Sequence, residues 1–306
     1  MLRALLQSFA ECHTPPGVEP LFLIVENDHQ ARSRATIESL RPKLGGRQLV
    51  LVLETELGIP FGRNRAIDEA LARGADLLAF VDDDEVVARD WLVHLVAEYR
   101  RSGADLIGGP VRIMPPDAGL GPMQRAIHRG VAARLARREA QMAAMARSGR
   151  PFRHTIVTNN WLARTTLFSD HGLRFDESLR HTGGSDAAFD EQVRARGLSK
   201  SWAPEALVFE TLPAERLSFA YQFTRAKDQS KVSLRRKMAR GEERVAFDVL
   251  VVVPLRLVGS LGLVLMLPFR PGLALVDLAR SLGWTAGRVL GLCGSRSRLY
   301  ERITGD

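Results

Sequence analysis

The sequence predicts an α/β fold in which a mostly parallel sheet is covered by helices on both faces, with amphipathic and hydrophobic helices following at the C-terminal end. Short apolar runs alternate with helical stretches over the first two thirds of the chain. The 306 residues, 45% hydrophobic and 25% charged, are typical of a globular protein. A long apolar segment replaces the alternation in the last third. We therefore expect one domain over 1–240 and a membrane-associating helical region over 241–306.

Strand and helix patterns follow one another in order along the N-terminal part. A short helix at Leu2–Cys12 precedes the apolar run Leu21–Val25, and such continuous runs are typical of parallel strands buried on both faces. Sheets of this kind bind ligands at the carboxyl ends of their strands. The other expected elements are helix 31–41, strand 48–53, helix 63–73, strand 76–81, helix 90–101, strand 105–111, helix 120–147, a turn at 182–186 that opens a helix to 196, and strand 206–209.

The apolar segment Val249–Leu267 has 19 residues and is interrupted by Pro254 and Arg256. About 20 apolar residues span a bilayer, but a central arginine costs about 2.5–3.5 kcal/mol on insertion scales. Three interpretations are open: an interfacial or re-entrant membrane helix, a true span, and a buried packing helix or hairpin. The preceding basic run Lys231–Arg244 would favour an anionic cytoplasmic leaflet, and 273–292 is a second amphipathic segment.

The net charge of +8 indicates anionic partners, and the excess is local. Gln124–His154 contains eight arginines and one acidic residue, and it predicts a helix whose basic face is either solvated or turned to a membrane or partner. The basic stretches lack the regular aromatics that stack bases, so we expect no nucleic-acid partner. Cys12 and Cys293 are far apart in the sequence, and no signal-peptide pattern precedes them, which favours a cytoplasmic setting.

Four acidic residues, Asp82–Glu85, directly follow the apolar run 76–81. Carboxylates at the end of a strand lie where an open α/β sheet binds its ligand, and like charges this close demand a cation. Mg²⁺ or Mn²⁺ bridged to a diphosphate meets that demand. The alternative is a solvated acidic turn that caps the helix beginning near Asp90.

A second motif, Gly58–Ala66, begins a helix and carries Arg63 and Asn64. The N-terminus of a helix together with arginine is a natural anion site. A diphosphate could therefore be held between this helix and the metal. Ordinary capping with exposed arginines is the alternative.

A third motif, Gly183–Asp186, forms a glycine turn at the start of another helix. A carboxylate fixed there could act as general base on a hydroxyl acceptor, provided that it lies within hydrogen-bond reach. The alternative is that Asp186 serves as a plain N-cap.

Short motifs follow one another in a specific order along the chain. They are Val25–Asp28, Gly58–Ala66, Leu78–Glu85, Asp90–Leu92, Thr158–Asn160, Phe175–Asp176, Gly183–Asp186 and Glu210–Pro213. This order resembles the family 2 glycosyltransferases, and within them it is most similar to the bacterial succinoglycan-type sugar transferases. The likeness spans about residues 2–240. It implies a GT-A nucleotide-sugar-binding fold, which is Rossmann-like, and an inverting, metal-dependent sugar transfer.

The resemblance also implies roles for single residues. Asp82 and Asp84 match the family's DxD motif, which implies that Asp84 binds Mn²⁺ or Mg²⁺ directly and that Asp82 contacts the ribose or the metal and its water. Asp186 matches the catalytic base, while the metal and Arg63 would stabilise the departing nucleoside diphosphate. The remaining assignments are Glu26, Asp28, Asn64 and Asp83 for nucleotide-sugar binding and Asn160, Trp161 and Ser185 for the sugar and acceptor pocket.

The chain departs from the family pattern in three places. The family's first strand and its Pro-Thr-Tyr-x-Arg-like turn are missing before Leu2. Two interpretations are open: the start of the chain has been placed too late, or the chain is a truncated copy whose nucleotide-base pocket is incomplete. Glu26 stands where many members have a base-contacting aspartate, so a UDP-sugar donor is a guess from the resemblance. The segment Gln222–Ala226 lacks the tryptophan of the QxxRW motif, which favours single-sugar addition.

The expected protein is a bacterial glycosyltransferase that moves one sugar from a nucleotide-diphosphate sugar to a polysaccharide or lipid-linked oligosaccharide. We expect it at the cytoplasmic face of the inner membrane, in peripheral or re-entrant association with the anionic surface. The alternative is a truncated, non-catalytic glycosyltransferase-like protein that binds a membrane or a partner. A nucleotidyltransferase is a third hypothesis, disfavoured because no glycine-rich, basic loop follows the first strand.

Overall fold

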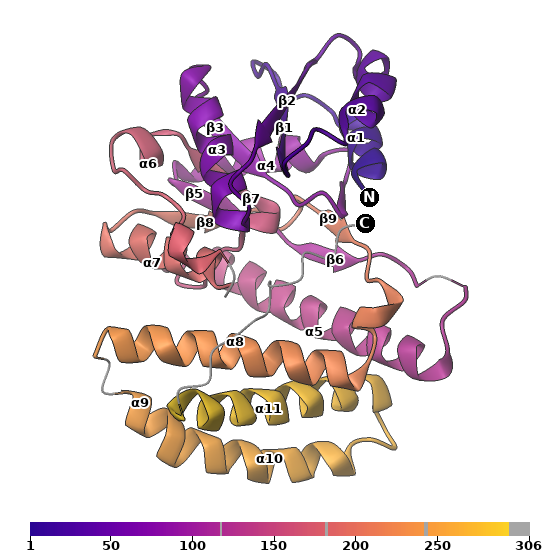
Figure 1. Ribbon diagram of the computed structural model, residues 1–306, viewed down its shortest axis with the longest axis vertical. Coiled ribbons are helices and arrows are strands. Elements are labelled where there is room, and N and C mark those ends of the chain that lie inside the picture. The colour runs from indigo at the N-terminus through magenta and orange to yellow at the C-terminus, as the bar shows by residue number, and fades with distance from the viewer. Residues whose placement is uncertain (117, 181–182, 242–243, 294–306) are drawn as a thin grey trace. The chain divides into compact units, whose positions relative to one another are not determined.

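The computed structural model describes residues 1–116, 118–180, 183–241 and 244–293 (Figure 1). The chain divides into two compact units. Unit 1 comprises Met1–Arg112, Arg137–Arg180 and Ser185–Thr211, and unit 2 comprises Ile113–Ala136, His181–Gly184 and Leu212–Asp306. The residues from Leu212 to 240 therefore group with the C-terminal helices, whereas the sequence analysis assigned them to the first domain.

The first two strands of unit 1 form a parallel pair. β1 (Leu21–Asn27) and β2 (Gln48–Glu54) run in register, so that their carboxyl ends, Asn27 and Glu54, lie opposite each other. The apolar runs at 21–25 and 48–53 predicted both strands. β1 extends two residues beyond its run and β2 extends one residue beyond its run. The helices along this part are α1 (Leu2–Glu11), α2 (Arg34–Leu40), α3 (Ile59–Ala72) and α4 (Trp91–Ser102), with a 3₁₀ turn η1 at Arg41–Leu44.

The remaining strands of unit 1 make two further sheets, and their directions are mixed. One sheet has the order β3-β7-β5-β8, with β7 antiparallel to both β3 and β5, and β5 parallel to β8. The other has the order β4-β9-β6, with β4 antiparallel to β9. Their bounds are β3 Leu77–Phe80, β4 Glu85–Val87, β5 Leu106–Gly108, β6 Val111–Ile113, β7 Trp161–Arg164, β8 Lys200–Trp202 and β9 Val208–Glu210.

The α/β class is confirmed, but the sheet is less parallel than expected. The sequence analysis missed β4, β7 and β8, since runs of three or four residues are too short to show a strand period. β7 is the strand that changes the topology, because it pairs antiparallel with both β3 and β5, which were expected to belong to a mostly parallel sheet. The single strand expected at 105–111 is broken by Gly109 and Pro110 into β5 and β6.

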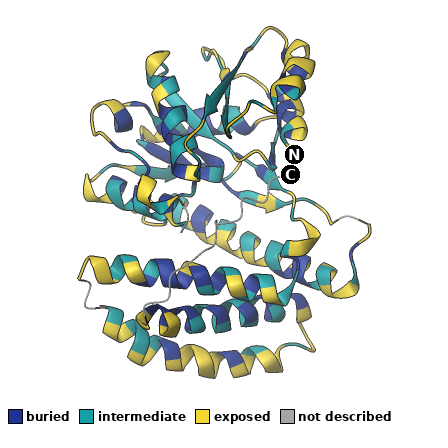
Figure 2. Ribbon diagram, viewed as in Figure 1, coloured by how far each residue is buried: buried dark blue, intermediate teal, exposed yellow. Residues whose placement is uncertain are grey.

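Two apolar clusters form the core of unit 1 (Figure 2). In the first, Leu6, Ile37 and Leu95 from α1, α2 and α4 are fully buried. The second is aromatic and contains Trp161 and Phe175. The other short elements are η2 Thr158–Asn160, α6 Thr166–Ser169, η3 Glu177–Leu179, α7 Ser185–Ala195 and η4 Ala214–Arg216, the last of these in unit 2.

Unit 2 is helical, and its two longest C-terminal helices pack with their backbones unusually close. α8 (Phe219–Ala239) lies along α11 (Pro271–Leu292). A Cβ on Gly283 would lie 2.2 Å from the carbonyl oxygen of Phe223, and one on Gly287 would lie 2.2 Å from that of Lys227. Glycine is therefore required at these α11 positions by close approach. Helix α5 (Pro122–Arg147) contributes its first part, up to Ala136, to this unit.

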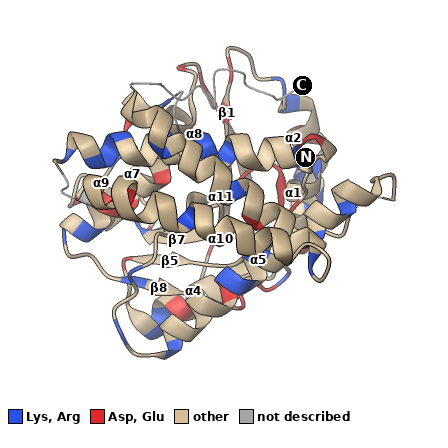
Figure 3. Ribbon diagram, turned by 90° about the horizontal axis from the view of Figure 1, so that it is seen from below, with Lys and Arg blue, Asp and Glu red and all other residues tan. Residues whose placement is uncertain are grey.

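The apolar segment of the last third forms α9 (Arg244–Phe247), the π-helical turn η5 (Asp248–Val252) and α10 (Val253–Leu265). The stretch Val245–Leu265 is long and apolar enough to cross a membrane, and only 11% of its most apolar window is buried. The buried-helix interpretation therefore does not fit this stretch. Most of the α10 ribbon is coloured as exposed in Figure 2 and as neither acidic nor basic in Figure 3. The exposed apolar residues of the stretch include Phe247, Leu250, Leu255, Val258, Leu261 and Leu265.

Asp248 and Arg256, the two charged residues of Val245–Leu265, contact other helices of unit 2. The Arg256 guanidinium lies 4.2 Å from the ring centre of Trp284 on α11, and Arg288 stacks on the same ring at 4.7 Å. Asp248 pairs with Lys237 at 2.6 Å and with Arg288 at 3.3 Å. Arg256 is itself exposed, and the other exposed side chains of α10 are apolar.

Candidate functional site

The acidic motif forms a tight loop between β3 and β4. The backbone N–H of Asp82 donates to Glu85 Oε2 at 2.9 Å, which closes the loop around Asp83 and Asp84. Asp82 and Asp83 are exposed, Asp84 is half-buried and Glu85 is 1% exposed. The loop therefore turns aspartates outward at the end of a strand, as the sequence predicted.

Negative charge in this loop is incompletely compensated. Desolvation by the surrounding protein raises the pKa of Asp82 to about 6, opposed by Arg63 and reinforced by Asp84 and Asp186. The side chain of Asp82 is still 48% exposed, so water screens part of this effect. A carboxylate that resists ionisation among other carboxylates would be relieved by a divalent cation.

The donor set fits Mg²⁺ or Mn²⁺ bound together with a diphosphate. Among the described residues, no cluster of three or more His, Cys, Asp or Glu side chains is placed to hold a metal alone. Mg²⁺ sites often use only one or two carboxylates, with substrate phosphates and water completing the shell. Asp82 and Asp84 can supply those two carboxylates.

Glu85 is a buried member of the loop that the sequence analysis quoted but did not assign. Burial, with Asp82 as the next cause, raises the pKa of its carboxyl to about 10. Asn159 Nδ2 lies 3.0 Å from Glu85 Oε1. Glu85 thus links the acidic loop to η2 rather than serving as an exposed ligand. Because glutamate is a polar residue, no feature of the sequence indicated that Glu85 is buried.

Arg63 on α3 joins two of the predicted site residues. Its Nη1 donates to Asp186 Oδ1 at 2.7 Å and to Ser185 Oγ at 3.2 Å, while Nη2 lies 3.7 Å from Asp82 Oδ1. The guanidinium also stacks on Phe175 at 5.4 Å and is 13% exposed. The Arg63 guanidinium therefore links the acidic loop and Asp186 in a single site.

Asp186 lies in the first turn of α7, two residues after Gly184. Both glycines have positive φ, 76° and 88°, which explains the glycine pair at this turn. The carboxylate accepts from Arg63 and, at 2.7 Å, from the hydroxyl of Thr158. In the described part of the chain, these contacts and not α7 backbone N–H groups hold it, so the plain N-cap interpretation does not fit.

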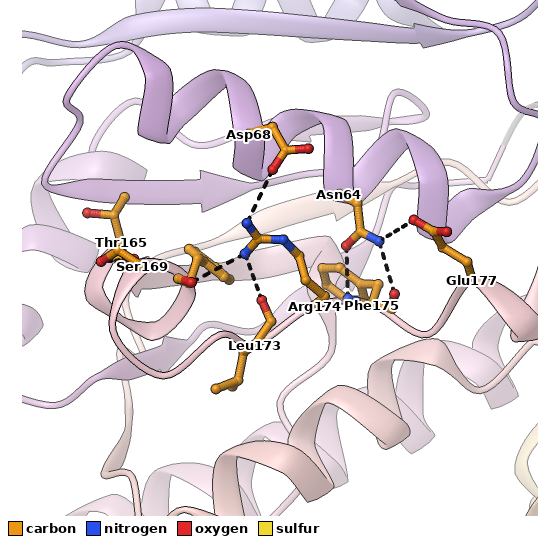
Figure 4. Close-up of polar contacts among 9 residues, drawn as sticks. Asn64, Asp68, Thr165, Ser169, Leu173, Arg174, Phe175 and Glu177 are labelled. Atoms are coloured by element: carbon orange, nitrogen blue, oxygen red, sulfur yellow. Dashed lines mark hydrogen bonds and ion pairs between the residues drawn. The ribbon is translucent and has the colours of Figure 1, made fainter.

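Asn64 makes structural hydrogen bonds to the segment that carries Phe175 (Figure 4). Its Oδ1 accepts from the N–H of Phe175 at 2.9 Å, and its Nδ2 donates to the carbonyl of Phe175 and to Glu177. Arg174 binds the same α3 surface through Asp68 at 3.2 Å. The amide of Asn64 is thus used to fix the segment that carries Phe175 under Arg63, and its role in nucleotide binding stays a prediction.

Glu26 and Asp28 lie at the carboxyl end of β1, where both are engaged by the following loop. Glu26 accepts from the N–H and hydroxyl of Ser33, and Asp28 pairs with Arg32 at 3.2 Å. Asn27, which the sequence analysis passed over, ties this end of the sheet to α3, because its Oδ1 accepts from the N–H of Gly58 at 2.7 Å. Its position between two candidate residues was the available clue.

Asn160 and Trp161 are buried beneath the site. Asn160 Oδ1 accepts from Trp91 Nε1, and its Nδ2 donates to the carbonyls of Pro110 and Ala206. Trp161 is 1% exposed and packs its ring at 5.0 Å from that of Phe189. In this structure neither side chain is open to a sugar, so both support the site from below, and their pocket roles remain predictions.

The sequence of this chain matches the model of a known protein family and the sequence of a known relative. The family model "Glycosyl transferase family 2" matches residues 2–171. The succinoglycan biosynthesis protein ExoM of Rhizobium meliloti (strain 1021) is 32% identical over 216 residues, which is 71% of this chain and 64% of that protein. The mannosyltransferase PcManGT from Pyrobaculum calidifontis, solved in complex with GDP-Man and Mn²⁺, is similar with a TM-score of 0.60 at 15% identity, over 95% of this chain and 83% of that one.

Proposed function

Because the chain belongs to glycosyltransferase family 2, we propose that it is a glycosyltransferase that transfers a single sugar from a nucleotide-diphosphate sugar to a saccharide or lipid-linked acceptor. The observation that carries this proposal is the Arg63 guanidinium between Asp82 and Asp186. Its contacts with the acidic loop and with Asp186 support a common role for these residues. The aligned relative is covered over 64% of its length, so its pathway is a guide to the acceptor class only.

Asp186 is the general base in this proposal. Its carboxylate takes the proton of the acceptor hydroxyl as that oxygen attacks the anomeric carbon, and the bond to the nucleoside diphosphate breaks on the opposite face. Attack from the face opposite the leaving group inverts the anomeric centre. Arg63 places positive charge beside the acidic loop, where charge develops on the departing diphosphate. Mn²⁺ or Mg²⁺ held by Asp84 and Asp82 would neutralise the same charge.

The donor is bound, in this proposal, along the carboxyl ends of β1 and β3. Glu26 and Asp28 follow β1, and Asp82 and Asp83 follow β3. A UDP-sugar is the donor that we propose to test first. Ser185, Asn160 and Trp161 would shape the acceptor side, the latter two from beneath.

Membrane association is the second part of the proposal. The exposed apolar face of α10 is too large to be left in water without a partner. Basic residues precede it in the run Lys231–Arg244, which begins on α8. We propose that this face lies in the interfacial region of the cytoplasmic leaflet, with the basic residues near anionic headgroups.

Calorimetric binding of UDP, GDP and dTDP, with and without Mn²⁺, tests the proposed function in wild-type protein and in Asp84→Asn. We expect one nucleotide to bind with Mn²⁺ and this binding to be lost in the variant. Asp170→Asn, a change at an exposed aspartate outside the site, is the matched control. Folded wild-type protein that binds none of the nucleotides would favour the non-catalytic alternative.

A further inference from the structure

We propose that Thr158 is a positioning residue that presents one particular oxygen of Asp186, Oδ2, to the acceptor hydroxyl. The proposal rests on the proposed role of Asp186 as general base and deepens it. Thr158 was part of a quoted motif in the sequence, but no role was assigned to it. Its hydroxyl lies 2.7 Å from Asp186 Oδ1, a distance typical of a strong hydrogen bond to a carboxylate.

Both donors to Asp186 bind the same oxygen. Arg63 Nη1 and the Thr158 hydroxyl each lie 2.7 Å from Oδ1. Within the residues that the structure describes, Oδ2 has no protein partner, and 31% of the side chain is exposed. Two donors on one oxygen restrict rotation of the carboxylate, so that the oxygen left to accept a proton is the accessible one.

The position of Thr158 is itself fixed by its neighbours in η2. Asn160 is anchored through Trp91, Pro110 and Ala206, and Asn159 binds Glu85. Thr158 is 2% exposed, so its hydroxyl does not exchange its partner for water. A carboxylate has no proton to give when ionised, so the hydroxyl must donate to Oδ1. The hydrogen bond thus has a fixed direction as well as a fixed length.

Thr158 is a cleaner probe of this arrangement than Arg63. Arg63 also faces Asp82 and would contact the diphosphate, so its replacement changes donor binding and the base together. Among the side-chain contacts of the described residues, the Thr158 hydroxyl contacts Asp186 alone. Removal of this hydroxyl therefore changes the hydrogen bonding of the proposed base without removing a residue that would contact the nucleotide-sugar.

The experiment compares Thr158→Val, which keeps the shape but loses the hydroxyl, with Thr158→Ser, which keeps the hydroxyl. The assay is release of nucleoside diphosphate from the donor with water as acceptor, so the natural acceptor need not be known. For T158V we expect kcat to fall about 10- to 100-fold, in line with misplacement of a catalytic group, with the KM for the donor unchanged. T158S should restore most of the activity, because a loss due to packing would not be rescued by a hydroxyl.

Thr165→Val serves as the structural control, because the Thr165 hydroxyl is also buried but donates to the carbonyl of Ala75. It should lower the melting temperature without lowering kcat in the folded protein. If T158V does not fold, Thr158→Ala replaces it, since a smaller side chain cannot clash.

Two results would overturn the inference: an unchanged kcat in T158V, or an equal loss in T158V and T158S. Wild-type protein that neither binds a nucleotide nor releases one would instead overturn the proposed function, and the role of Thr158 with it. The two failures are therefore distinguishable by the behaviour of the wild type.

Discussion

At the scale of single residues, the site depends on one arginine between two carboxylates. Arg63 is held by the ring of Phe175 and by Ser185, so its charge is placed before any ligand binds. Preorganised charge of this kind needs no reorganisation when charge develops on the substrate. The same geometry gives Asn64, which the sequence analysis assigned to nucleotide-sugar binding, a structural contact as well. It lies one residue after Arg63 and holds the segment on which Arg63 stacks.

Replacement of Asp186 by asparagine should abolish proton abstraction without loss of shape. We expect kcat to fall about 10²- to 10⁴-fold, the range associated with general base catalysis, while Mn²⁺-dependent nucleotide binding is retained. Calorimetry and donor turnover measure the two effects separately. Transfer at the wild-type rate in this variant would exclude Asp186 as the base.

The two cysteines should differ in reactivity. Burial raises the pKa of the Cys12 thiol, and the thiolate is the reactive form. Cys293 is exposed. At pH 8 we therefore expect iodoacetamide to alkylate Cys293 in the native protein and Cys12 only after unfolding, as read by mass spectrometry of the two peptides. Equal labelling in the native protein would show that Cys12 is accessible.

At the scale of elements, close helix packing in unit 2 depends on glycines. The Cβ clash at Gly287 involves a backbone carbonyl of α8, which cannot move aside as a flexible side chain could. By contrast, a Cβ at Gly262 on α10 would meet nothing within 4 Å. The two helices therefore use glycine for different reasons.

Gly287→Ala and Gly262→Ala make a matched pair. Gly287→Ala should lower the free energy of unfolding by about 1–3 kcal/mol, the usual cost of overpacking, although alanine favours a helix. Gly262→Ala should be neutral or stabilising by up to about 1 kcal/mol, from helix propensity alone. Chemical denaturation followed by circular dichroism measures both. A Gly287→Ala variant as stable as Gly262→Ala would contradict the packing of α8 on α11.

At the scale of the whole molecule, the chain combines a family 2 catalytic unit with an apolar helix. The resemblance predicted from the order of motifs is confirmed by the family match over residues 2–171. In the helical segment of unit 2, Arg256 stacks on Trp284 and Asp248 pairs with Arg288, and most of the exposed side chains are apolar. Such apolar side chains add membrane affinity roughly in proportion to the apolar area that they bury.

Flotation with liposomes tests the membrane part. We expect the wild-type protein to float with vesicles of phosphatidylglycerol and phosphatidylcholine and to float less with phosphatidylcholine alone or at high salt. A double change, Leu261→Gln with Leu265→Gln, should weaken binding at least about tenfold, since each buried leucine contributes about 1.5–3 kcal/mol. Met123→Gln, at an exposed apolar residue of α5, is the control. Undiminished flotation of the double variant would show that α10 does not carry the contact.

The sequence by itself determined the α/β class, most helices and longer strands, the family, and the residue types that the chemistry needs. These properties follow from local patterns: apolar period, glycine turns, and acids at the end of an apolar strand. The resemblance in the order of the motifs further implied that Asp82, Arg63 and Asp186 belong to one function.

Only the tertiary structure decided which atoms meet. Arg63 and Asp186 are 123 residues apart in the sequence, and their contact depends on how α3 and α7 pack. The antiparallel insertion of β7, the burial of Glu85 and Asn160, and the hydroxyl of Thr158 on Asp186 likewise depend on long-range contacts. A short strand or a single polar side chain shows no hydrophobic periodicity in the sequence. Its position in the fold is therefore determined by tertiary packing.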